Sequence, residues 1–173
     1  MFVRDFIHVA QPFQTIAPRF LCDPGWLRPI VDKAVDEAAR VSRALAGSPE
    51  EVGDAIAHTA TAPEVQLDRG AVRSRARGLV VPITWSNVME HIWFPPISGD
   101  LEIAPIGPSR SELVLSASYQ SPKALDPPRE QALVEPAAAH PAVVHRVVEA
   151  GVRAFLQNLA ITLETEHAES PRR

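Results

Sequence analysis

Several features that would assign this 173-residue sequence to a function class are missing from it. Cys22 is the only cysteine, so the chain can form neither an intrachain disulfide nor a paired-cysteine metal or redox site. The uncharged run at residues 78–89 is interrupted by Pro82 and is far shorter than the roughly 20 apolar residues that span a bilayer. The net charge is −4, which argues against a non-specific binder of nucleic acid or of anionic membranes.

Signatures of common enzymes are missing as well. The sequence contains no P-loop, no dinucleotide-binding glycine motif, no nucleophile elbow and no zinc-protease helix. Its histidines, among them His140 and His145, show no ligand spacing, so we expect neither a metal nor another cofactor. Arg4 and Asp5 interrupt the apolar region that a signal peptide would need, and a cytoplasmic protein is therefore expected.

The composition that remains is that of a globular protein rich in proline. Hydrophobic residues make up 46% of the chain and charged residues 22%, which excludes wholesale disorder. Seventeen prolines against eight glycines indicate many rigid loops and argue against an all-helical bundle. The length suits one domain, which we predict at residues 1–165, followed by a polar tail at residues 166–173.

Two segments have the apolar periodicity of long amphipathic helices. Residues 27–45 repeat apolar side chains at three- and four-residue spacing after an entry signal at Asp23 and Pro24. The second helix is predicted to open near Pro141. Its apolar stripe consists of Val144, Val148, Val152, Phe155, Leu159 and Leu163. Between the first strand and the first long helix, residues 13–21 predict only one or two helical turns broken by Pro18.

Four segments alternate apolar and polar residues as strands do. They are residues 2–10, 64–85 with a turn near residues 69–70, 99–106 and 112–119. The last two are separated by Pro105, Gly107 and Pro108, and predict a hairpin. Residues 121–139 have no period, which is typical of a functional flap or of a flexible segment.

Arg73, Arg75 and Arg77 alternate with small residues and are predicted to share one face of a strand. We expect a solvated face that pairs with Asp100 and Glu102 and resists edge-to-edge aggregation. Binding of a phosphate or of an acidic partner is the alternative.

The order of these elements predicts an α+β fold whose helices bury their apolar faces against an antiparallel sheet. Several segments then resemble small actinobacterial members of the SRPBCC superfamily, also called START-like or helix-grip proteins. They are residues 23–27 (DPGWL), 81–85 (VPITW), 94–107 (FPPISGDLEIAPIG), 113–119 (LVLSASY) and 145–156 (HRVVEAGVRAFL). The resemblance implies a curved antiparallel sheet wrapped around a long C-terminal helix, with an apolar cavity between them. That superfamily includes lipid carriers and polyketide cyclases.

The ligand-binding candidates are mostly aromatic. They are Trp85, Trp93, Phe94, Tyr119 and Phe155, joined by Val152 and His91. A cavity lining that grips a hydrophobic ligand is one interpretation, since such sites are mainly apolar. Ordinary core packing is the other. His91 next to Glu90 is either an acid–base pair at the cavity mouth or, as we favour, a solvated pair in a loop.

We therefore predict non-catalytic binding of a small hydrophobic molecule, such as a lipid, polyketide or isoprenoid, between the sheet and the C-terminal helix. One alternative is a cyclase or aromatase-like enzyme, for which Tyr119, Ser116, Ser118 and His91 are the polar candidates. Another is a protein-interaction module with a collapsed cavity. A homodimer or a protein partner is left open, and Cys22 is expected to be a buried, inert thiol.

Overall fold

The structure is a computed structural model that describes residues 1–45, 65–87, 95–120 and 141–169. Its strands are β1 (Phe2–Val9), β2 (Val65–Arg69), β3 (Arg73–Arg75), β4 (Gly78–Asn87), β5 (Ile97–Pro105) and β6 (Ser111–Tyr119). Its helices are α1 (Phe13–Leu21), the 3₁₀ turn η1 (Pro24–Leu27), α2 (Arg28–Leu45) and α4 (Pro141–Glu169). The connection at residues 121–139 lies outside the described residues.

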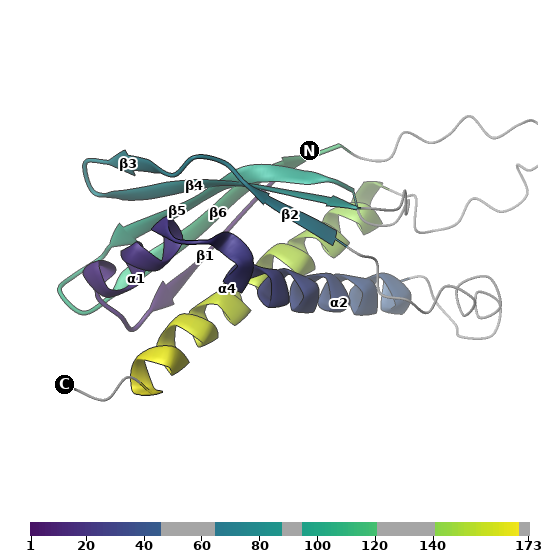
Figure 1. Ribbon diagram of the computed structural model, residues 1–173. Helices are drawn as coiled ribbons and strands as arrows, with labels where there is room; N and C mark the ends of the chain where they lie inside the picture. The colour runs from purple at the N-terminus through teal and green to yellow at the C-terminus, as the bar shows by residue number, and fades with distance from the viewer. Residues whose placement is uncertain (46–64, 88–94, 121–140, 170–173) are drawn as a thin grey trace, which may run out of the picture.

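All six strands belong to one antiparallel sheet in the order β1-β6-β5-β4-β2, with β3 paired to β4. The first strand therefore lies beside the last, where Phe2 pairs with Ser118 and Val9 with Ser111. Figure 1 shows a curved sheet with α2 and α4 on the same face, and α4 crossing beneath the strands. This arrangement confirms the predicted α+β helix-grip fold.

The core lies between that face of the sheet and the two long helices. Because side chains alternate along a strand, every second residue of β5 and β6 points to the helices. The predicted apolar stripe of α4 is buried along its whole length. Fully or almost fully buried residues include Val81, Trp85, Leu101, Ile103, Leu113, Leu115, Val148, Val152, Phe155 and Leu159. Among the described helices none is long and apolar enough to cross a membrane.

The start of the first long helix is as its sequence suggests, with one refinement. The Asp23 carboxylate accepts a hydrogen bond from the Gly25 backbone N–H at 3.0 Å and begins a 3₁₀ turn at Pro24. Helix α2 follows directly at Arg28, and Pro29 lies in its first turn, where a missing N–H costs nothing.

At the other end of the chain, α4 extends to Glu169, four residues into the segment assigned to the polar tail.

The prediction for the three arginines is right for two of them and wrong for the third. Arg73 donates to both carboxylate oxygens of Asp100, at 2.9 and 3.0 Å, and Arg75 donates to Glu102 at 3.2 Å. Arg77 does not share their face, because Arg75 pairs with Gly78 across a two-residue turn that contains Arg77. The chain reverses at that point, so the alternation ends at Arg75.

Two expectations about residues 13–22 are wrong. Helix α1 runs unbroken through Pro18 from Phe13 to Leu21, and burial of Phe20 and its neighbours in the core holds it together. Cys22 is exposed rather than buried, because it follows the last helical residue. Its carbonyl oxygen and that of Phe20 accept hydrogen bonds from the Arg69 guanidinium at 2.7 and 2.6 Å, which ties this end of α1 to strand β2.

Candidate ligand site at the Tyr119 end of the sheet

Four of the predicted ligand residues lie in the layer between the sheet and α4. Trp85 pairs with Ile97 of β5, and Ile97 pairs in turn with Tyr119 of β6. The three side chains therefore form one row across three strands, on the face that the helices cover. Phe155 of α4 meets this row, since its ring lies 5.0 Å from the Trp85 ring in a T-shaped arrangement. Sheet register and helix periodicity together bring Trp85, Tyr119 and Phe155 to one region.

Val152 and Phe155 are packed as core residues. Both have an exposed fraction of 0%, so neither borders solvent or an internal space large enough for water. Trp85 is almost as deeply buried, with an exposed fraction of 1%. Tyr119, with an exposed fraction of 4%, lies at the margin of the layer. A ligand contact at Val152 or Phe155 would require the interface to open, and that role stays a prediction.

Three other predicted ligand residues, His91, Trp93 and Phe94, lie outside the described residues. Their roles also stay predictions. Ser116 and Ser118, considered as polar groups of an enzyme site, point to the sheet face opposite the helices. The reason is the two-residue period of β6, which sends Ala117 and Tyr119 inward and the two serines outward.

A polar chain begins at Tyr119 and continues along α4. The Tyr119 hydroxyl oxygen lies 2.5 Å from Nδ1 of His145, and the two rings stack with their centroids 6.1 Å apart. Nε2 of His145 lies 3.3 Å from Oε1 of Glu149, one helical turn further on. The imidazole is about one-third exposed and the carboxylate about half exposed, at 35% and 49%. The Tyr119–His145–Glu149 chain therefore leads from the margin of the core to the surface.

Glu149 brings a negative charge close to the hydrogen bond between Tyr119 and His145. Which of these two groups donates depends on the tautomer of the imidazole. Burial raises the pKa of the Tyr119 hydroxyl, and the nearby negative charge of Glu149 raises this pKa further. Tyr119 is thus held as a neutral phenol.

Sequence reasoning selected Tyr119 but missed His145 and Glu149 as its partners. One signal was available, because an i,i+4 His–Glu pair on a helix places both side chains on one face. The link to Tyr119 was not available, because it depends on how α4 is rotated against the end of β6. Among the described residues no group of three or more His, Cys, Asp or Glu side chains is placed to hold a metal ion.

Tyr119 is the only tyrosine in the chain, so its ionisation can be followed directly. We expect the near-ultraviolet absorbance of tyrosinate to appear at a higher pH in the folded protein than in urea, where the ordinary value of about 10 applies. The folded state holds this proton more tightly, so its contribution to stability is complete below pH about 10. It is lost as the pH rises through the raised pKa of the folded state. Coincident titration curves in the two states would contradict this.

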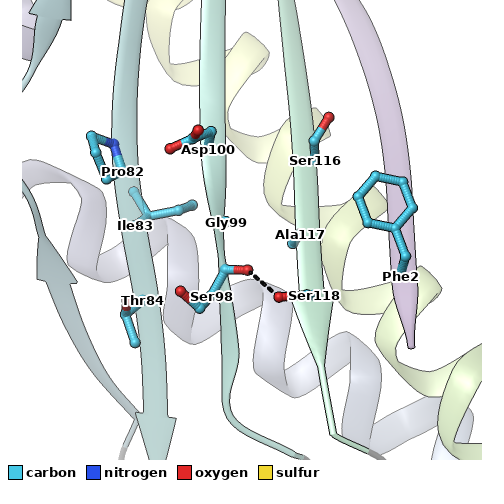
Figure 2. A pocket seen from close by; sticks show the side chains of 10 residues that line it. All are labelled: Phe2, Pro82, Ile83, Thr84, Ser98, Gly99, Asp100, Ser116, Ala117 and Ser118. Atoms are coloured by element: carbon cyan, nitrogen blue, oxygen red, sulfur yellow. Dashed lines mark hydrogen bonds between the residues drawn. The ribbon is translucent and has the colours of Figure 1, made fainter.

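Two hollows of the described surface lie elsewhere. One, of about 340 Å³, is on the sheet face away from the helices, and Figure 2 shows Ser98, Ser116 and Ser118 in it together with Phe2. The other, of about 630 Å³, is a groove between α2 and α4 that includes Lys33, Glu37 and Arg153. Neither contains Trp85, Tyr119 or Phe155. The polar margin at Tyr119, rather than an open hollow, marks the candidate site.

The sequence matches no protein-family model and no curated protein. Two solved structures are similar to it in three dimensions. The Zhui aromatase/cyclase from Streptomyces sp. R1128 is 14% identical with a TM-score of 0.43, covering 95% of this chain and 93% of that chain. A conserved protein from Geobacillus kaustophilus is 11% identical with a TM-score of 0.46, covering 94% and 95%. The class of this protein, α+β with a helix-grip fold, is defined by its own strand order and by α4.

Proposed function

We propose that this chain is a cytoplasmic member of the SRPBCC superfamily that binds a small hydrophobic molecule at the Tyr119 end of the sheet–α4 interface. The observation that supports it best is the juxtaposition of a buried aromatic pair, Trp85 and Phe155, with the hydrogen-bonded hydroxyl of Tyr119. Small-molecule sites have this composition, a mostly apolar surface with a few placed polar groups.

The position of the polar chain favours this end of the interface over its middle. Around Val152 and Phe155 the core is closed, and a ligand there would have to displace packed side chains. Tyr119 is the last residue of β6, and its hydrogen-bond partner His145 lies four residues after the start of α4 at Pro141. A ligand entering here could place its apolar part against Trp85 and its polar end against the Tyr119 hydroxyl.

Entry requires the start of α4 to separate from the end of β6. Helix α4 packs chiefly on α2 and β1, and makes far fewer contacts with β6. The Tyr119–His145 hydrogen bond joins α4 to β6 at this point. A ligand whose polar group competes for Tyr119 weakens this link as it binds, and so favours the open form.

An enzyme of the cyclase or aromatase kind is a second candidate. The observation that favours it is the same Tyr119–His145–Glu149 chain, because an imidazole held by a carboxylate can accept a proton relayed through a hydroxyl. Turnover of a polyketide-like substrate that is lost in His145→Leu would establish this candidate over simple binding.

Native mass spectrometry of freshly expressed protein tests the binding proposal. We expect an added mass that organic extraction removes, followed by saturable binding of an environment-sensitive apolar dye to the extracted protein. Trp85→Phe should weaken dye binding several-fold, because it shrinks the aromatic surface at the site. The matched control is Trp26→Phe, since Trp26 packs on Phe20 and Arg19 at the α1 end and should leave binding unchanged.

The proposal fails if no mass co-purifies and the extracted protein binds no dye, a result that would favour an interaction module with a collapsed cavity. It also fails if Trp85→Phe and Trp26→Phe change dye affinity equally, because the dye would then bind somewhere other than the Tyr119 end of the interface.

A further inference from the structure

The hollow on the sheet face away from the helices has a floor of hydroxyl side chains (Figure 2). Phe2 pairs with Ser118, and Ser118 pairs in turn with Ser98. Ser98 pairs with Thr84, so one row of side chains crosses four strands on this face. Ser116 adds a fourth hydroxyl from the neighbouring row. The hollow therefore has a polar floor with an aromatic ring at one end.

Most of these hydroxyl groups are not used inside the protein. The Ser118 hydroxyl donates to the backbone carbonyl of Ser98 at 3.3 Å. Within the described ranges, the hydroxyls of Thr84, Ser98 and Ser116 have no hydrogen-bond partner. A hydroxyl can donate one hydrogen bond and accept others. The floor therefore suits a ligand that brings several hydroxyls of its own better than it suits an apolar ligand.

The Asp100 carboxylate lies at the side of the hollow, in the row that also contains Ser116 and Pro82. Its two oxygens accept hydrogen bonds from Nη2 of Arg73 at 2.9 and 3.0 Å. An ionised carboxylate has about four acceptor positions, so about two are left for a ligand. Because Arg73 balances the negative charge, this wall favours a neutral hydrogen-bond donor over a charged ligand.

The Phe2 ring forms the apolar wall of the hollow and is 61% exposed. A backbone hydrogen bond from the Tyr119 N–H to the Met1 carbonyl, at 3.0 Å, holds the start of β1 to the end of β6. The flat face of an aromatic ring packs well against the C–H face of a sugar ring. The volume of about 340 Å³ lies at the lower end of the range of about 300–1,000 Å³ for small-molecule sites. A ligand of one or two rings fits that volume.

We propose that this hollow binds the neutral, polyhydroxylated ring of a carbohydrate. The Phe2 ring packs against its C–H face, and Asp100 accepts hydrogen bonds from two neighbouring hydroxyls. The serine and threonine hydroxyls of the floor bond to the remaining polar groups of the sugar. This site is independent of the Tyr119 end of the interface, because the two lie on opposite faces of the sheet.

Nuclear magnetic resonance titration of the full chain tests this with four probes. Three are the methyl glycosides of glucose, galactose and mannose, which differ in the orientation of single hydroxyls. The fourth, 2-methoxytetrahydropyran, has the ring but no hydroxyls. We expect at least one glycoside to shift the backbone N–H signals of Ser98, Gly99 and Ser116 saturably. The tetrahydropyran should bind at least about tenfold more weakly, because it leaves the polar floor unpaired.

The chain offers a matched control for each of two variants. Phe2→Ala should weaken glycoside binding several-fold, because it removes the aromatic wall. Phe6→Ala should not, since Phe6 lies on the same face of the same strand and is 60% exposed, but is not part of the hollow. Asp100→Asn should weaken binding about tenfold, because hydrogen bonds to a charged acceptor are the stronger ones. Its control is Glu102→Gln, because Glu102 pairs with Arg75 outside the hollow.

The proposal is overturned if none of the three glycosides shifts these signals, or if the shifts gather in the groove between α2 and α4 instead. It is also overturned if 2-methoxytetrahydropyran binds as tightly as the glycosides. Equal affinities in either variant and its control would mean that the sugar does not use that wall, and would overturn it too. Thermal unfolding of all four variants checks that the fold is kept.

Discussion

Replacing Phe155 with alanine should lower the free energy of unfolding by about 3–5 kcal/mol, the usual cost of removing a large aromatic side chain from a packed interior. The ring has no exposed surface and packs edge-on against Trp85 at 5.0 Å. The cavity left behind is flanked by the rigid sheet, so it cannot collapse fully. Urea unfolding measures this loss in the free energy of unfolding. The slope of that free energy with urea concentration must be the same in the parent protein and in Phe155→Ala.

The loss of unfolding free energy in Phe155→Ala also shows how closely the sheet and α4 pack around this ring. A loss of only about 1–2 kcal/mol would mean that the ring has few neighbours and borders a space, which would contradict the closed interior described above. Phe6→Ala is the matched control, because the Phe6 side chain in β1 is 60% exposed. Its effect should stay within about 0.5 kcal/mol, as is usual for surface substitutions.

Val152→Asp should abolish cooperative folding. Val152 lies on the buried stripe of α4 with an exposed fraction of 0%, so a carboxylate there would be surrounded by apolar side chains. Burying an unpaired charge costs many kcal/mol, against a total stability of about 5–15 kcal/mol for a domain. Circular dichroism during urea titration should show no sigmoidal transition at neutral pH.

Ile161→Asp is the control for that substitution. Ile161 lies on the same helix and is 60% exposed, so the same change in chemistry should leave folding almost unaffected. If Val152→Asp and Ile161→Asp unfold with equal cooperativity and at the same urea concentration, α4 does not turn the Val152 face toward the sheet as described above. That result would remove the basis for placing His145 beside Tyr119.

The fold could be predicted largely because its main elements have clear periods. Helices α2 and α4 repeat apolar residues at helical spacing, and all six residues of the predicted α4 stripe are buried. Strands β5 and β6 alternate along most of their length, with the buried Val114 as an exception, so the hairpin and its inward face could both be predicted from the pattern. Arg77 and Cys22 were misplaced because each lies just beyond the end of an element, where the period stops being informative.

The candidate site could be predicted only in part, for a geometric reason. Trp85, Tyr119 and Phe155 were found because large aromatic side chains in strands and helix stripes tend to be buried together. The hydrogen bond between Tyr119 and His145 joins residues of different elements, and it depends on both the strand register and the rotation of the helix. The same holds for Arg69, whose contacts with the carbonyls of Phe20 and Cys22 span more than forty positions in sequence. No local pattern encodes such pairs.

The pairing of β1 with β6 has a consequence for how this protein is made. Strand β1 is synthesised before its partner residues, Ser111 to Ser118, which lie about a hundred positions later in the sequence. Until then its apolar side has no neighbouring strand, and the stripe of α2 has no α4 to cover it. Contacts this distant in sequence slow folding and expose incomplete chains to aggregation. We expect nascent chains that end before α4 to depend on chaperones, and release of the last helix to be the step that completes the domain.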